Sequence, residues 1–290
     1  MNKHKKIKSA SILGIFANVF LLVIKGLVGF FTGSLAMLAD TMNSAGDIFS
    51  SVLTYIGNKI SSKPSDDDHN LGHGKAEYIF SLLISIVMIL MSWKVLISSV
   101  KSLFTGERFD FSIWLVVVCI VTIFIKFLLY LYTNYLYKKY DNILIKANSM
   151  DHRNDCFVTT TNLIACLCAI FNIFIIDSIV GIGISIWIII SAFKLFKESY
   201  DVLMDKSMSI DTKNKVLEII NNHKEIYRIN HFNATPVGYK YQISFTIFVD
   251  GNLSTYESHD IANKLEKEID KKVDEIYLTV IHVNPIDKKM

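Results

Sequence analysis

The first two thirds of the chain consist of long apolar segments that are separated by short polar connections. Six of these segments approach the roughly 20 apolar residues that a membrane-spanning helix needs. They cover about residues 12–31, 35–57, 79–104, 111–135, 151–176 and 178–196. The second and fifth are the least apolar, because they contain aspartate and many Ser, Thr and Asn residues. Such helices are stable in a bilayer when their polar side faces a bundle interior, so we expect an α-helical membrane protein with six transmembrane helices.

A different pattern begins after residue 205, in a part of the chain where charged residues are frequent. Helical and alternating spacings of apolar residues predict five elements. In order, these are a helix from near Asp211, strands near 226–233 and over 239–249, a helix over 254–270 and a strand over 275–283. We therefore expect a transmembrane domain over residues 1–205 and a small α+β domain, of order α-β-β-α-β, over residues 206–290.

Composition agrees with a membrane protein. Hydrophobic residues make up 51% of the 290 residues, and the mean hydropathy of +0.37 exceeds that of soluble globular proteins. The 30 basic and 27 acidic residues leave a net charge of only +3, which excludes a general attraction to nucleic acid. The four cysteines lie in apolar segments, and we expect them to be small core residues. The long first apolar run has no cleavage site and indicates a spanning helix instead of a signal peptide.

Lysine residues are concentrated on one side of the expected bundle. They occur at the N-terminus and in the connections after the second and fourth segments, as Lys3, Lys5, Lys6, Lys8, Lys59, Lys63, Lys75, Lys138, Lys139 and Lys146. The opposite side contains only Arg108, which Glu107 and Asp110 balance. Connections rich in Lys and Arg stay in the cytoplasm. We therefore expect both termini in the cytoplasm and the cell membrane as the location.

Two pairs of oxygen-bearing side chains lie one helical turn apart in the two polar segments. Asn43 and Asp47 form the first pair, and Asp151 and Asp155 form the second. Residues four apart share one face of a helix, and a carboxylate at membrane depth indicates an ion or proton path. These side chains could instead have a purely structural role, in helix–helix hydrogen bonds or in pairs with lysine. Such a role explains two separate pairs less well than an ion site does. The two helices together predict a metal site with four oxygen ligands.

The chemistry of these ligands indicates what the site exchanges. Carboxylates packed together need a cation or protons, because like charges cannot all remain ionised side by side. A site that exchanges a divalent cation for protons has the properties of an antiporter. Oxygen ligands without His or Cys favour harder ions such as Mn²⁺ over Zn²⁺, although the order of affinities alone does not exclude zinc.

Lys25, Asp40 and Lys126 are further charged residues within the apolar segments. Lys25 and Asp40 are each about 10 Å deep from the turn between the first two segments, so we expect them to form a buried pair. Alternatively, Asp40 is a metal ligand on the side of the membrane where the ion leaves, because it shares a helix face with Asn43 and Asp47. Lys126 has no evident partner, and we expect its ammonium to extend along the helix toward the membrane surface.

A cluster of acidic and histidine residues follows the second segment. It consists of Asp66, Asp67, Asp68, His69 and His73. From composition alone, a solvated acidic turn and a metal site explain it equally well.

Four stretches of the sequence, in the same order, resemble the cation diffusion facilitator family. They are residues 33–47, 68–77, 151–155 and 281–285. The resemblance implies a homodimer of six-helix subunits that exports divalent metal from the cytoplasm against protons, with no cofactor and no enzymatic activity. Zinc members usually place a histidine at the position of Asp151, and often a His or Asp at that of Asn43. The set of Asn43, Asp47, Asp151 and Asp155 is therefore similar to the manganese-exporting branch.

The resemblance also implies roles outside the transmembrane segments. It makes Asp66, His69 and His73 a secondary metal site. It also implies that Lys75 and Asp205 form an ion pair that links the two domains, a charge interlock.

In the C-terminal domain, the resemblance makes His231, His259 and His282 a regulatory metal site at the dimer interface. Two positions depart from the family pattern, since Ser244 replaces a common histidine and Asn284 a common aspartate. Surface histidines on a dimerisation domain explain the pattern equally well. We expect metal to bind weakly there and dimerisation to persist without it.

Manganese export by proton antiport is the leading hypothesis, and a zinc, iron or cobalt exporter of the same fold is the nearest alternative. A membrane-embedded hydrolase would use Asp47 and Asp155 as an acid–base pair. The sequence lacks, however, both the His-Glu-x-x-His and the Gly-x-Ser-x-Gly motifs. Intact ligands in both polar helices disfavour a metal sensor that does not transport.

Overall fold

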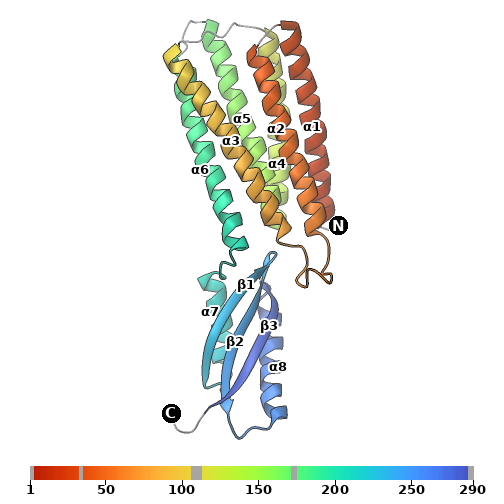
Figure 1. Ribbon diagram of the computed structural model, residues 1–290, viewed down its shortest axis with the longest axis vertical. Coiled ribbons are helices and arrows are strands. Elements are labelled where there is room, and N and C mark those ends of the chain that lie inside the picture. Colours follow the sequence, from red (N-terminus) through yellow and green to blue (C-terminus); the bar gives the residue numbers. More distant parts are fainter. Residues whose placement is uncertain (1–2, 33–34, 106–112, 171–174, 287–290) are drawn as a thin grey trace. The chain divides into compact units, whose positions relative to one another are not determined.

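The computed structural model describes residues 3–32, 35–105, 113–170 and 175–286. The chain divides into two compact units (Figure 1). The first contains residues Met1–Pro64 and Ala76–Tyr200, and the second contains Ser65–Lys75 and Asp201–Met290. The loop Ser65–Lys75 therefore belongs to the same unit as the C-terminal residues, although it connects two helices of the first unit.

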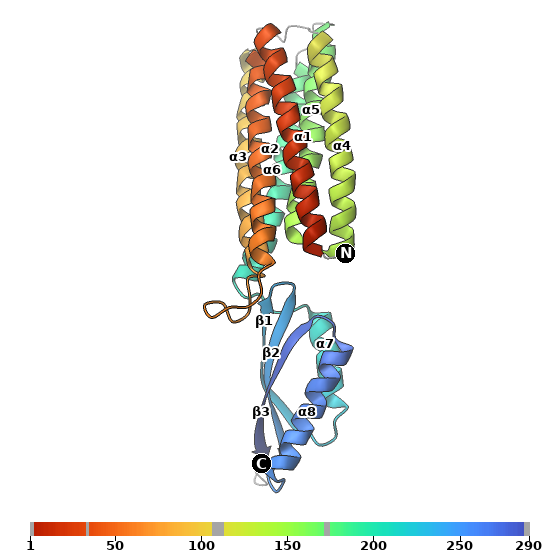
Figure 2. The same cartoon turned by 90° about the vertical axis from the view of Figure 1, so that its right-hand side faces the viewer.

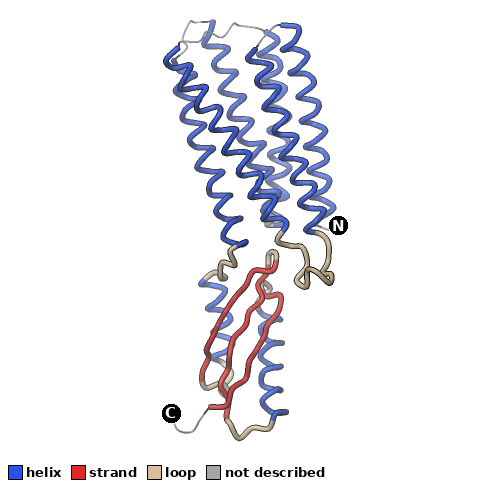
Figure 3. The backbone as a smooth tube through the Cα atoms, in the orientation of Figure 1, coloured by secondary structure: helices blue, strands red, loops and turns tan. Residues whose placement is uncertain are grey.

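The first unit is a bundle of long helices (Figure 3). They are α1 (Lys3–Thr32), α2 (Leu35–Ser61), α3 (Ala76–Thr105), α4 (Ile113–Tyr140), α5 (Ile143–Ile170) and α6 (Ile175–Leu203). Within the described residues, α1, α3, α4 and α6 are long and apolar enough to cross a membrane. All six helices are long enough for the six predicted spans, but among the described residues only the four helices just named are also apolar enough by their hydropathy. The polar residues of α2 and α5 lower their hydropathy, as the sequence indicates.

A ladder of buried and half-buried polar side chains joins α1 to α2 along their length. The polar residues of α1 recur every seven positions and so lie on one helix face. The hydrogen bonds of this ladder join His4 to Asn58, Asn18 to Ser51 and Lys25 to Ser44. The Asn148 amide of α5 also donates to Thr54 of α2, at 3.2 Å. These bonds satisfy polar groups that would be costly to leave unpaired in a bilayer.

The starts of α1 and α3 meet the end of α2 and the α4–α5 connection at Glu77. This glutamate is buried, and it accepts hydrogen bonds from Asn142 at 2.6 Å and Ser61 at 3.4 Å. The Lys3 ammonium lies 3.5 Å from the same carboxylate. One end of the bundle therefore contains the helix ends where the sequence is rich in lysine.

The second unit has the predicted order α-β-β-α-β. Its elements are α7 (Ile210–Asn221), β1 (Arg228–Val237), β2 (Lys240–Asp250), α8 (Thr255–Lys272) and β3 (Ile276–Ile286). The sheet order is β1-β2-β3, with β1 and β2 antiparallel and β2 and β3 parallel. Both helices cover the same face of the sheet (Figure 2). Val216 of α7 and Leu265 of α8 pack with Ile243 and Ile247 of β2 in a core of this unit's own.

Candidate metal centre

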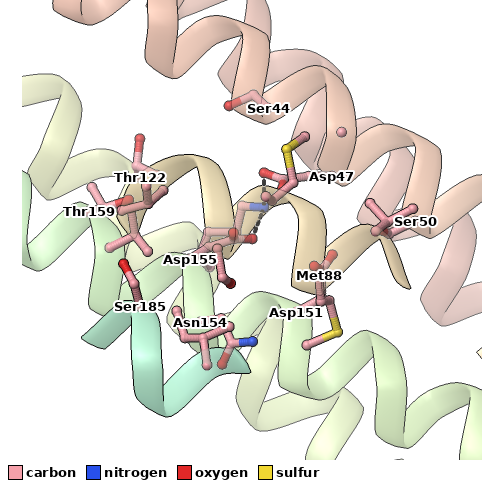
Figure 4. Close-up of a pocket in the computed structure, with 18 of the residues that line it drawn as sticks. Ser44, Asp47, Ser50, Met88, Thr122, Asp151, Asn154, Asp155, Thr159 and Ser185 are labelled. Atoms are coloured by element: carbon pink, nitrogen blue, oxygen red, sulfur yellow. Dashed lines mark hydrogen bonds and ion pairs between the residues drawn. The ribbon is translucent and has the colours of Figure 1, made fainter. Parts of the chain in front are cut away.

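A cavity of about 70 Å³ lies inside the helix bundle and is lined by acidic residues. Asp47 from α2 and Asp151 and Asp155 from α5 all border it (Figure 4). Met88 of α3 and Ser185 of α6 border it from the other helices. The structure thus brings together three of the four predicted ligands, and they reach the same space from two helices.

Both carboxylates of α5 reach the same site because Asp151 and Asp155 are four residues apart and therefore share one face of the helix. Oxygen atoms of Asp151 and Asp155 and a ring nitrogen of His152 all lie within 4.8 Å of one another. Asp151 is only 8% exposed. A carboxylate at this depth has a high free-energy cost unless a cation or a proton accompanies it.

Lys126 of α4 lies between two of these carboxylates. Its ammonium is 2.7 Å from Asp47 Oδ2 and 2.5 Å from Asp155 Oδ2, and the side chain is 1% exposed. Both contacts are drawn as dashed lines in Figure 4. The expectation that Lys126 extends toward the membrane surface is therefore wrong. Its two carboxylate partners offset the desolvation cost that would otherwise draw the ammonium toward water.

A sequence signal for the position of Lys126 exists. Thr122 and Thr133 of α4 are fully buried and lie four residues before and seven residues after Lys126. This spacing places all three polar residues on one helix face. A polar stripe in an otherwise apolar helix faces the bundle interior, so the stripe indicates an inward lysine.

Several polar atoms that line the cavity are buried without a hydrogen-bond partner among the described residues. They are Ser50 Oγ, Thr122 Oγ1, Asp151 Oδ2 and Asn154 Nδ2. Buried polar atoms are paired in the great majority of cases. The oxygen atoms in this set, together with the carboxylates, are suitable ligands for a divalent cation and its water molecules.

Two predicted residues of α2 have side chains that lie outside the described part of the structure. They are Asn43, the fourth predicted ligand, and Asp40, the predicted partner of Lys25. The Lys25 ammonium donates to Ser44 Oγ at 3.1 Å. The pairing of Lys25 with Asp40 and the ligand role of Asn43 therefore stay predictions.

His152 is a polar residue of the site region that the sequence did not single out. It is fully buried, and neither ring nitrogen has a hydrogen-bond partner within the described parts of the chain. Its Nε2 atom lies 3.7 Å from the position that a Cβ atom on Gly14 of α1 would take. The ring thus occupies space next to a glycine of α1, a packing relationship that sequence spacing does not indicate.

The loop cluster forms in the second unit. His69 donates its backbone N–H to Asp66 Oδ1 at 2.7 Å, and His73 Nε2 lies 3.5 Å from Asp66 Oδ2. Desolvation raises the pKa of Asp66, but hydrogen bonds from His69 and the charges of both imidazoles outweigh it and lower the pKa below its usual value. The three side chains place ligand atoms within 4.8 Å of one another. The structure therefore brings the predicted loop residues together.

Lys75 and Asp205 also form the expected contact. The Lys75 ammonium donates to Asp205 Oδ1 at 2.6 Å, and both side chains are exposed. Both residues belong to the second unit, so their role in joining the two domains stays a prediction. Gly74 approaches the β1–β2 turn beside this pair, where a Cβ atom would lie 2.9 Å from Gly238 Cα.

The three histidines of the C-terminal domain do not form a cluster within one chain. His231 lies in β1, His259 in α8 and His282 in β3, and all three are exposed. Since β2 separates β1 from β3, a shared metal would need ligands from elsewhere. The weak interface site stays a prediction.

Comparisons with known proteins give consistent matches over both units. Residues 11–204 match the cation efflux transmembrane domain, and residues 208–286 match the cation efflux protein cytoplasmic domain. Manganese efflux system protein MneS of Bacillus subtilis is 30% identical over 98% of this chain and 98% of that protein. Its counterpart MneP, from the same organism, is 28% identical over 96% of each. The metal-bound C-terminal domain of the CzcD transporter from Thermotoga maritima is 27% identical, and the match covers 29% of this chain and 100% of that chain with a TM-score of 0.27.

Proposed function

Because the chain belongs to the cation efflux family, whose members are transporters and not enzymes, we propose that it exports divalent metal, foremost Mn²⁺, from the cytoplasm in exchange for protons. Family membership makes it an integral membrane protein with a helical transmembrane domain and a C-terminal domain that contains a small sheet. The hydrolase alternative is thereby excluded.

One observation carries the proposal for the transport site. Asp47, Asp151 and Asp155 border a single cavity inside the bundle. Three carboxylates in so small and buried a space are costly without a cation. The proposed cargo site therefore consists of these aspartates, with Asn43 as the fourth ligand from the same turn of α2.

The donor atoms and the relatives both support manganese. Carboxylate and amide oxygens suit Mn²⁺ better than softer ions, and MneS and MneP are described as manganese efflux proteins. A zinc, iron or cobalt exporter remains the second candidate, and His152 favours it. An imidazole nitrogen within 4.8 Å of two carboxylate oxygens is a ligand suited to these metals.

Proton exchange follows from charge balance in the cavity. When the metal leaves, three carboxylates remain with the ammonium of Lys126 beside them. One positive charge does not balance three negative charges, so protons from the release side replace the rest. This exchange makes the inward proton gradient the driving force for export.

The proposed topology has six spans, with both termini in the cytoplasm of the cell. The contacts at Glu77 support it, because they gather the lysine-rich helix ends at one end of the bundle. Cytoplasmic segments are rich in lysine and arginine. We assign residues 1–205 to transport and residues 206–290 to dimerisation.

The proposed assembly is a homodimer. Leu278 and Val280 of β3 are 39% and 44% exposed, and residues two apart in a strand share one face. Exposed apolar residues of this kind are available to a second subunit. The loop residues Asp66, His69 and His73 supply a secondary metal site in each subunit.

The test of the proposed function is transport by the purified protein in liposomes under an inward proton gradient. Mn²⁺, Zn²⁺, Fe²⁺ and Co²⁺ are offered separately, and the initial rate is measured for each. We expect the highest rate with Mn²⁺. A higher rate with Zn²⁺ would favour the second candidate, and no flux of any of the four metals would contradict metal export.

A further inference from the structure

Lys126 occupies the position between two proposed metal ligands. Its nitrogen contacts Oδ2 of Asp47 at 2.7 Å and Oδ2 of Asp155 at 2.5 Å. A divalent cation that joined the same oxygens would lie at about 2.0 to 2.6 Å from each. The two positions overlap, so the ammonium and the metal cannot both bridge these atoms.

The surroundings of Lys126 hold the ammonium in place. The side chain is 1% exposed, whereas those of Asp47 and Asp155 are 14% and 22% exposed. A buried ammonium is stable only with carboxylate partners. An incoming metal must therefore separate two buried ion pairs before it can bind the same two oxygen atoms.

An alternative position for the displaced ammonium exists on α4 itself. Thr122 lies one helical turn before Lys126, is fully buried and lines the same cavity. Its Oγ1 atom has no hydrogen-bond partner among the residues that the structure describes. The flexible four-carbon stem of lysine allows the ammonium to move without a change in the helix.

We propose that Lys126 is a built-in competitor of the transported cation. It occupies the position between Asp47 and Asp155 in the metal-free protein and is displaced toward Thr122 when metal binds. The lysine keeps its proton throughout and only moves. By lowering the affinity for metal, it promotes release on the far side of the membrane. This inference rests on the proposed function, since it assumes that the two aspartates bind the cargo.

The test compares Mn²⁺ affinities of the purified full-length protein, measured from the loss of the free-ion electron paramagnetic resonance signal. Every variant and the parent also carry Asp66→Asn, which weakens the loop site. Lys126→Met removes the charge and keeps the length of the side chain. We expect it to bind Mn²⁺ at least about tenfold more tightly than the parent. Lys126→Arg retains the charge and should restore weak binding. Lys146→Met is the matched control, because Lys146 pairs with Glu198 outside the cavity, and its affinity should equal that of the parent.

Transport kinetics provide a readout that a purely structural role would not change. In liposomes, Lys126→Met should lower both the KM for Mn²⁺ and the maximal rate, because tighter binding slows release. If Lys126→Met does not fold, as judged by size-exclusion chromatography, Lys126→Gln takes its place with the same expectation.

Two results separate this inference from the proposed function. If Asp47→Asn, in the protein that also carries Asp66→Asn, abolishes the remaining Mn²⁺ binding but neutral variants of Lys126 bind no more tightly than their parent, the competitor role is refuted and the metal site stands. If Asp47→Asn binds Mn²⁺ as the parent does, the proposed site itself is refuted, and the competitor role with it.

Discussion

The ammonium of Lys126 on α4 lies 2.5 Å from a carboxylate oxygen of Asp155 on α5. The same nitrogen contacts Asp47 on α2, so three helices meet at one charged atom. The cavity therefore contains a cation of the protein's own beside the carboxylates that we assign to the cargo. A metal that binds the same carboxylate oxygen atoms competes with this cation.

The first prediction concerns the proposed ligands. Asp47→Asn and Asp155→Asn should each lower the Mn²⁺ transport rate at least about 100-fold, since even the loss of a residue that supports a ligand lowers metal affinity about 10- to 100-fold. Each variant should still elute as the folded protein, because asparagine keeps the shape of aspartate. The measurement is the initial rate of Mn²⁺ flux in liposomes.

The matched control is Asp141→Asn. Asp141 is exposed between α4 and α5 and has a φ of 43°, which asparagine also tolerates. Transport by this variant should equal that of the wild type. Wild-type rates in Asp47→Asn or Asp155→Asn would show that these carboxylates do not hold the cargo.

The second prediction concerns the choice of metal. Asp151→His should raise the rate for Zn²⁺ relative to that for Mn²⁺, because imidazole suits zinc better than a carboxylate does. The measurement is the ratio of the two initial rates in the wild type and the variant. An unchanged ratio would show that the ligand at this position does not determine selectivity.

The elements of the fold could largely be predicted from the sequence. The five elements of the C-terminal domain follow from local spacing, because one face of each helix or strand is buried in the core of that unit. The aspartates of α5 could be assigned to one site, because residues four apart share a helix face. The apolar sequence around Lys126 does not by itself indicate an inward position, but buried Thr122 and Thr133 mark the same face of α4 as polar. The position of His152 depends on its packing beside Gly14 of another helix, which no local pattern contains.

The third prediction concerns the loop site. Asp66→Asn should weaken metal binding at the loop at least about tenfold, measured by isothermal titration of a protein that also carries Asp155→Asn. The lowered pKa of Asp66 keeps its carboxylate ionised within the pH range in which an aspartate usually titrates, and the proton returns only as the pH falls through the lowered pKa. The effect should therefore be equal at neutral and mildly acidic pH.

Asp67→Asn is the control for this loop experiment. Asp67 is an exposed neighbour of Asp66 and is not a member of the ligand cluster. It should leave the affinity of the loop for metal unchanged. Equal losses in both variants would indicate general attraction by acidic residues instead of a defined site.

The fourth prediction concerns the C-terminal domain. Residues 206–290 should fold alone, because Val216, Ile243 and Leu265 belong to a core within this segment. We expect the segment to sediment as a dimer after chelation of metal, since its three histidines are exposed and apart in the chain. A metal-free monomer that dimerises with stoichiometric Zn²⁺ or Mn²⁺ would contradict this expectation.

The most direct test of the account follows Mn²⁺ and protons at the same time in liposomes that contain the wild type or Asp155→Asn. One dye reports the metal inside the liposomes, and a second dye reports the internal pH. The account predicts that Mn²⁺ moves in one direction while protons move in the other, and that Asp155→Asn abolishes both movements. Mn²⁺ flux through the wild type without proton movement, or undiminished flux through Asp155→Asn, would contradict it.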